Sequence, residues 1–152
     1  MGCLEWTMDR NALIWAMFGF AIAGLSVSAY LTYLSLMPPT SCPVGDFAFF
    51  SCDEVIWSVY SKLYGVSVAL LGFGWFVVSL ALIVLTRWNW RFIRGVLVWA
   101  LLGTIGVGGF VYTEVFLIGS ICPLCTVAHL AGVAIFVLSV LGTRSRTAPA
   151  ES

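Results

Sequence analysis

Charged residues are scarce in this chain of 152 residues. Only 9% of them are Asp, Glu, Lys or Arg, whereas soluble domains carry roughly a quarter, and 61% are hydrophobic. The 7 basic and 7 acidic residues cancel, so the excess positive charge of a nucleic-acid-binding surface is missing. The 5 cysteines are also too few for a small secreted scaffold built on disulfides. We therefore expect a protein of the lipid bilayer with no nucleic-acid partner.

The apolar residues are gathered in long uncharged runs, and a transmembrane helix needs about 20 such residues. The runs predict an all-α fold, an integral membrane four-helix bundle. Its expected spans lie near residues 12–36, 63–86, 95–116 and 122–141. Between the first two we expect an outward-facing loop, 38–62, with a short amphipathic helix after Cys52. The spans form one catalytic domain, residues 1–145, followed by a disordered tail, 146–152. The first run is too long for a cleavable signal peptide.

The basic residues predict the orientation of the spans, because Lys and Arg favour the cytoplasmic side. Lys62 falls on one side of the predicted bundle and the other basic residues on the opposite side. These are Arg10, Arg87, Arg91, Arg94, Arg144 and Arg146. Both termini are thus predicted to be cytoplasmic, and the loop 38–62 and the turn 117–122 to face outward. All cysteines except Cys3 then lie at the extracytoplasmic face of the cell membrane, where disulfides persist.

A Cys-x-x-Cys motif, Cys122-Pro123-Leu124-Cys125, opens the fourth predicted span. Two residues spaced i, i+3 lie on one face of a helix, and Pro123 suits a first helical turn. A thiolate at a helix N-terminus is stabilised by unpaired amides and the helix dipole. The chain's single histidine, His129, follows one turn after Cys125 on the same face. The motif is typical of a redox-active dithiol.

Three interpretations of the extracytoplasmic cysteines compete. In the first, both pairs are structural disulfides. This suits Cys42 and Cys52 better than Cys122 and Cys125, because a disulfide across a Cys-x-x-Cys spacing is strained. Alternatively four thiolates bind zinc, for which an oxidising membrane edge is a poor place, so we expect no metal. In the third, Cys42 and Cys52 form a mobile shuttle that exchanges disulfides with Cys122 and Cys125. We favour the third. The remaining cysteine, Cys3, is taken as a bystander, since its surroundings do not match a myristoylation motif.

The dithiol lies beside an apolar bundle, so its redox counterpart is expected to be lipid-soluble. A quinone, menaquinone-like or ubiquinone-like, accepts the two electrons that one dithiol releases. His129 is then a candidate hydrogen-bond or proton donor to the quinone, with a bond to a neighbouring backbone carbonyl as the alternative. Glu114 lies near the outer end of the third span, and an intramembrane carboxylate is a functional candidate. Anchoring of the outer loop and proton transfer are both open for it.

Several of these features together resemble the vitamin K epoxide reductase family in its compact prokaryotic form. They are the loop pair Cys42 and Cys52, Ser58, the sequence Leu63-Tyr64-Gly65, and Cys122-Pro123-Leu124-Cys125. The resemblance implies a four-helix bundle around a quinone, with Cys125 facing the ring. It also implies that Cys122 exchanges with Cys52 and that Cys42 meets the thiols of a partner.

The resemblance extends to three further positions. Ser58 corresponds to the family's loop serine, which supports the cysteine pair or its loop. Ser61 corresponds to a quinone-contacting Asn of the animal enzymes, and His129 to a Tyr near the quinone. The fused thioredoxin-like domain of some bacterial members is not expected here, which implies a separate thioredoxin-fold partner outside the cytoplasm.

The sequence thus predicts a quinone-dependent thiol-disulfide oxidoreductase that forms disulfides outside the cytoplasm. Two alternatives remain. Vitamin K epoxide reduction uses the same electron path with another acceptor. A non-catalytic bundle with structural disulfides has no use for the Cys-x-x-Cys spacing at a helix start.

Overall fold

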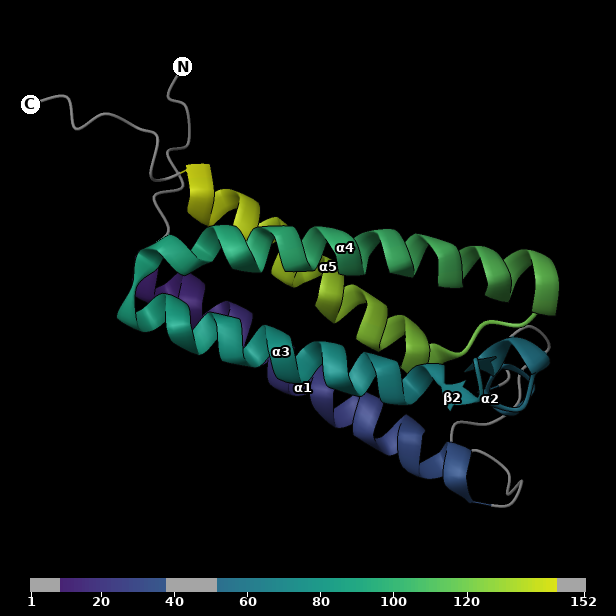
Figure 1. Cartoon of the computed structure of the whole chain (residues 1–152). Helices are drawn as coiled ribbons and strands as arrows, with labels where there is room; N and C mark the ends of the chain where they lie inside the picture. The colour runs from purple at the N-terminus through teal and green to yellow at the C-terminus, as the bar shows by residue number, and fades with distance from the viewer. Residues whose placement is uncertain (1–8, 38–51, 145–152) are drawn as a thin grey trace, which may run out of the picture.

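The computed structural model describes residues 9–37 and 52–144. Its long helices are α1 (Arg10–Leu36), α3 (Val68–Trp88), α4 (Ile93–Tyr112) and α5 (Pro123–Arg144). Four helical segments of the described chain are long and apolar enough to cross a membrane, the third being α4 with its flanking turns. They run side by side as a bundle, so the predicted all-α membrane fold is confirmed (Figure 1).

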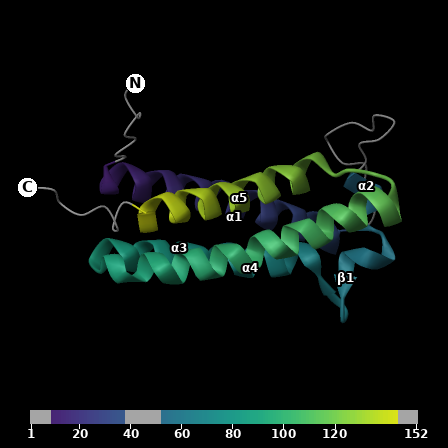
Figure 2. The same cartoon turned by 90° about the horizontal axis from the view of Figure 1, so that it is seen from above.

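The helices form a four-sided bundle in which each one packs against two neighbours. α1 lies along both α3 and α5, α4 lies along α5, and the contact of α3 with α4 is the weakest of the four. Seen from above, α1 and α5 form one layer and α3 and α4 the other (Figure 2). The start of α1, the end of α5 and the connection between α3 and α4 share one end of the bundle (Figure 1). The start of α5, which follows Cys122, lies toward the opposite end (Figure 1).

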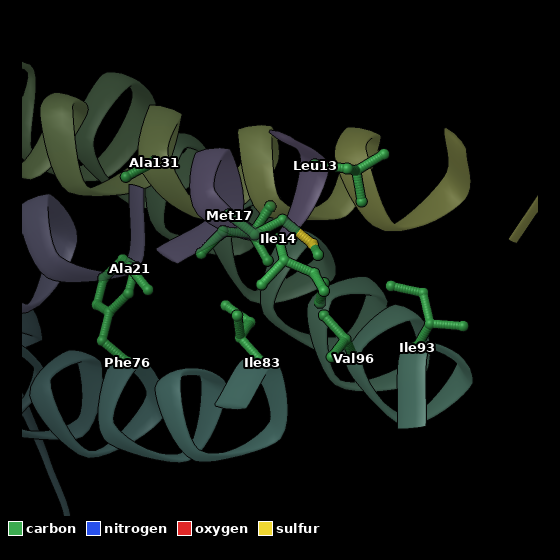
Figure 3. Close-up of a cluster of buried hydrophobic side chains, with 11 residues drawn as sticks. Leu13, Ile14, Met17, Ala21, Phe76, Ile83, Ile93, Val96 and Ala131 are labelled. Atoms are coloured by element: carbon green, nitrogen blue, oxygen red, sulfur yellow. The ribbon is translucent and has the colours of Figure 1, made fainter. Parts of the chain in front are cut away.

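The main hydrophobic core occupies the half of the bundle nearest the α3–α4 connection. Leu13 and Met17 of α1 meet Ile83 of α3, Ile93 of α4 and Ile135 of α5, all with at most 2% of their surface exposed. Figure 3 shows the side chains of this cluster converging between the helices. Close packing of this kind fixes the relative positions of the four helices. The opposite half of the bundle is therefore held in place while it leaves room for a cavity.

Small residues allow close approach in the middle of the bundle, as is common between membrane helices. A Cβ atom on Gly24 of α1 would overlap the Phe76 ring, and one on Gly103 of α4 would overlap the Trp75 ring. The Trp99 indole N–H then joins α4 to α3 by donating to the Trp75 carbonyl oxygen, 3.2 Å away. These contacts fix the rings of Trp75 and Trp99, which stack with centroids 6.2 Å apart.

A short helix and a hairpin connect the outer loop to α3. They comprise α2 (Cys52–Ile56), the 3-10 turn η1 (Val59–Ser61), β1 (Lys62–Leu63) and β2 (Val66–Ser67). The strands pair antiparallel, and Tyr64 and Gly65 between them have φ of 52° and 84°. Positive φ at both central residues defines a type I′ turn. The prediction that the second span begins at residue 63 is wrong, because these residues form the hairpin and the helix begins at Val68.

The third transmembrane segment is extended at both ends by other helical turns. The 3-10 turn η2 (Trp90–Phe92) precedes α4, and the π-helical segment η3 (Thr113–Ile118) follows it. Gly119, with φ of 75°, ends η3, and its N–H donates to the Glu114 carbonyl oxygen at 2.9 Å. π-Helical turns are rare and are frequently found at functional sites. Here it brings Glu114 and the residues after Gly119 to the same end of the bundle as α2.

Candidate redox site

The Cys-x-x-Cys motif caps the N-terminus of α5. Pro123 is the first residue of the helix, as its fixed φ and missing N–H favour. Cys122 precedes it, and its carbonyl oxygen accepts from both the N–H and the hydroxyl of Thr126, each at 3.0 Å. The Cys122 sulfur accepts from the backbone N–H of Cys125 at 3.3 Å. The two motif cysteines therefore share one turn at the helix start.

Cys52 lies directly against this motif from the other side. It is the first residue of α2, and its Sγ is 3.2 Å from the Sγ of Cys122. A disulfide bond is about 2.05 Å long, so the two sulfur atoms are in contact without being bonded. Both side chains are fully buried, with Leu31 of α1 in the same cluster. Thiol–disulfide exchange requires sulfur atoms to approach each other in this way.

A polar contact joins α2 to the turn before Cys122. The Ser120 hydroxyl donates to a carboxylate oxygen of Glu54. Ser120 is buried, and Glu54 comes two residues after Cys52. The contact therefore fixes the α2 backbone beside the motif. Neither residue belongs to the site predicted from the sequence, since nothing in the sequence pairs positions so far apart.

The surroundings of Cys122 stabilise its protonated form. The adjacent Cys125 thiol, followed by burial, raises the pKa of Cys122 well above its ordinary value. The helix N-terminus alone would favour a thiolate, which is what the sequence predicts. In the folded protein the neighbouring thiol and desolvation outweigh that effect. Cys122 is therefore a thiol at neutral pH, and its reaction as a nucleophile requires a group that removes the proton.

A cavity of about 370 Å³ opens between the four helices at the α2 end. Its wall includes five residues predicted for the site: Ser58, Ser61, Glu114, Cys125 and His129. The rest of the wall is mostly aliphatic, aromatic and glycine surface from α1, α3, α4 and α5. A largely apolar pocket with a few polar groups is the usual form of a small-molecule site. Of the two motif cysteines, Cys125 is the one that lines it.

Two aromatic stacks shape the inner part of this cavity. Phe110 of α4 stacks on the His129 imidazole, with ring centroids 6.3 Å apart and planes 5° from parallel. Deeper in the bundle, Trp75 and Trp99 form the second stack. The Trp75 indole nitrogen is the one buried side-chain nitrogen or oxygen of the described residues that lacks a hydrogen-bond partner. Flat aromatic walls of this kind suit a planar ring as ligand.

Glu114 joins the cavity to the motif. Its side chain is only 6% exposed, and it lies in η3 among the residues that line the cavity. The backbone N–H of Cys122 interacts with its carboxyl group. Glu114 therefore holds the residue whose sulfur contacts Cys52, and it faces the space that Cys125 faces.

The loop serines make local hydrogen bonds. The Ser58 hydroxyl donates to the Val55 carbonyl oxygen at 2.9 Å, and the Ser61 hydroxyl to the Ser58 carbonyl oxygen at 2.8 Å. Ser58 thus closes the end of α2, which begins at Cys52. Cys42 and Cys3 lie outside the described residues. Within the described ranges, no three His, Cys, Asp or Glu side chains are grouped as metal ligands would be.

Comparison with known families identifies the family of the chain. The model of the vitamin K epoxide reductase family matches residues 15–140, which include Cys52, Cys122 and Cys125. The chain belongs to the vitamin K epoxide reductase family. A search of curated proteins gave no match. Membership indicates an oxidoreductase, in a family generally associated with quinones, and the four apolar helices make this member a multi-pass membrane protein.

Proposed function

We propose that this member of the vitamin K epoxide reductase family forms disulfides in thioredoxin-fold proteins outside the cytoplasm and passes the electrons to a quinone. The observation that carries the proposal is the 3.2 Å contact between the sulfur atoms of Cys52 and Cys122. Cys122 shares a helical turn with Cys125, and Cys125 lines the apolar cavity. The sulfur atoms therefore form a path from the outer loop to the interior of the bundle.

The proposed path begins at Cys42, whose disulfide with Cys52 accepts two electrons from the partner's two thiols. A Cys52 thiolate then attacks Cys122 in the Cys122–Cys125 disulfide, and Cys125 leaves as a thiolate. Cys42 resolves the Cys52–Cys122 bond, so the outer disulfide is restored and the inner pair is reduced. Cys122 and Cys125 finally form their disulfide again and give two electrons and two protons to the quinone. The partner gains a disulfide and the quinone becomes the hydroquinone.

The cavity supports a quinone as the acceptor. Its apolar, aromatic wall suits the ring, and Cys125 is the redox-active side chain on that wall. We assign His129 and Ser61, which also line the cavity, as hydrogen-bonding contacts of the quinone. Ser58 supports α2 behind Cys52. The distribution of basic residues supports placing both termini in the cytoplasm and the redox cysteines at the extracytoplasmic face.

The test is turnover with defined reactants. Purified protein is mixed with a reduced thioredoxin-fold protein and a water-soluble short-chain quinone, and quinone consumption is followed by absorbance. The wild type is expected to consume quinone, and Cys125→Ala to lose this activity. Cys3→Ala is the matched cysteine control and is expected to retain it. Equal rates for wild type and Cys125→Ala would refute the proposal, and vitamin K epoxide in place of the quinone tests the other acceptor.

The order of exchange has its own test. Cys122→Ser removes the sulfur that receives electrons from Cys52, so the outer pair cannot pass electrons inward. A reduced partner that has opened the Cys42–Cys52 disulfide then accumulates on the loop, bonded to Cys42. A mixed disulfide between partner and protein is therefore expected on a non-reducing gel. Cys42→Ser is expected to abolish turnover with the protein partner. If that variant turns over at the wild-type rate, Cys42 is not the entry point.

A further inference from the structure

Among the residues whose side-chain burial the structure describes, Glu114 is the one acidic or basic residue that is buried. Its position is set by the π-helical segment η3, whose last turn is closed by the bond from the Gly119 N–H to the Glu114 carbonyl oxygen. The left-handed conformation of Gly119 reverses the chain there. The reversal returns the backbone N–H of Cys122 to the Glu114 carboxyl group. The carboxyl group therefore lies between the motif and the cavity.

The reaction of the inner cysteines requires protons to move at this place. Formation of the Cys122–Cys125 disulfide releases two protons, and the quinone takes up two. Cys125 lines the cavity and loses its proton directly into it. Cys122 does not line the cavity, is fully buried, and has a raised pKa because of the Cys125 thiol and burial. Its proton needs an acceptor that is close to it and that also reaches the cavity.

We propose that Glu114 is that acceptor, and that its carboxylate carries the proton of the Cys122 thiol to a quinone oxygen. The S–H bond of Cys122 breaks as the Cys122–Cys125 bond forms, and two electrons pass to the quinone. One proton travels through Glu114 and the other comes from Cys125, so Glu114 ends in its starting state. This assignment rests on the proposed quinone reduction. Glu114 would then be a catalytic residue in addition to an anchor of the Cys122 backbone.

Other ionisable groups near the site are less well placed. His129 lines the cavity from α5 but stacks on Phe110, one turn beyond Cys125. Glu54 of α2 is exposed, and it accepts from the Ser120 hydroxyl. Cys52 faces Cys122 with its own sulfur. Of these groups, Glu114 alone both contacts the Cys122 residue and lines the cavity.

Glu114→Gln separates proton transfer from anchoring. The Gln side-chain carbonyl can still accept from the Cys122 N–H, but the amide neither gains nor loses a proton in this pH range. Fully reduced protein is mixed anaerobically with a water-soluble short-chain quinone, and a single turnover is followed across a range of pH. The rate of Glu114→Gln is expected to fall about 100-fold, as is typical when a general acid–base group is lost. One ionisation is expected to disappear from its pH profile.

Glu114→Asp provides the second variant, because it keeps a carboxyl group on a shorter side chain. Its rate is expected to lie between those of wild type and Glu114→Gln. Oxidative cross-linking of Cys52 to Cys122 reports whether the anchor is intact, and Glu114→Gln is expected to cross-link as wild type does. A wild-type rate and pH profile in Glu114→Gln would overturn the assignment. A Glu114→Asp rate no higher than that of Glu114→Gln would also overturn it. Failure of the wild type to reduce the quinone would instead contradict the proposed function.

Discussion

The sulfur atoms of Cys52 and Cys122 lie 3.2 Å apart, although 70 positions separate the two residues in the chain. One belongs to the short helix α2 and the other caps the transmembrane helix α5. Both are fully buried, so the thiols of a folded protein partner cannot reach the contact directly. In the proposed function a partner protein therefore acts through another cysteine, and we assign that role to Cys42.

The hydrogen bond from Ser120 to Glu54 is expected to hold this contact. Ser120→Ala removes it and should slow oxidative cross-linking of Cys52 to Cys122 by about twofold to tenfold, the equivalent of a net hydrogen bond of ~0.5–1.5 kcal/mol. Cross-linking is measured on a non-reducing gel in a background lacking the other cysteines. The matched control is Ser26→Ala, whose exposed hydroxyl bonds the Ile22 carbonyl oxygen on α1. Equal rates in the two variants would show that the bond has no such role.

The raised pKa of Cys122 predicts how the reduced protein reacts with alkylating reagents. A raised pKa leaves less thiolate at a given pH, so the alkylation of Cys122 should reach half its maximal rate well above pH 9.0, its ordinary pKa. Cys125→Ala removes the largest cause of the shift and should lower this midpoint. Peptide mass spectrometry after timed iodoacetamide treatment measures both. Cys3→Ala serves as the control, and an unchanged midpoint in Cys125→Ala would contradict the stated cause.

The sequence is sufficient to predict the bundle, because hydropathy and length define a transmembrane helix without knowledge of its neighbours. It also predicts Cys122 and Cys125 on one helical turn, since that contact is local. The proximity of Cys52 to Cys122 was expected only through resemblance to a family. The Ser120–Glu54 bond has no signal of either kind, because each residue type is ordinary at its own position.

The start of α3 could not be predicted for a related reason. Residues 63–67 carry no charge and lead directly into the apolar helix, and two-residue strands are too short to show an alternating pattern. Tyr64 rather than Gly, Asn or Asp occupies the first position of the turn, so the usual type I′ signal is missing. Trp75 was missed because its packing on Gly103 and Trp99 depends entirely on how the helices assemble.

The proposed orientation predicts which end of the bundle is accessible from outside the cell. Tyr64 lies at the tip of the hairpin that precedes α3, and Trp88 is the last residue of α3. Their side chains are 101% and 81% exposed, respectively. In a cysteine-free background, Tyr64→Cys should react with a membrane-impermeant maleimide in intact cells. Trp88→Cys should react only after permeabilisation. The reverse pattern would place the redox cysteines in the cytoplasm and contradict the charge-based orientation.

Packing between α1 and α3 is expected to control both stability and the cavity. Gly24→Ala places a methyl group on the Phe76 ring, which is 4% exposed and packs edge-on against Trp75 at a centroid distance of 5.0 Å. Overpacking of this kind costs about 1–3 kcal/mol, and displacement of Trp75 would reshape the cavity wall. Gly24→Ala should therefore lower the Tm in detergent and raise the KM for a soluble quinone.

Gly19→Ala is the matched control on the same helix, because nothing lies within 4 Å of its added Cβ. Both substitutions gain the same helix propensity, so any difference between them measures the contact with Phe76. A Gly24→Ala protein as stable as Gly19→Ala would mean that α1 and α3 separate without cost at this position.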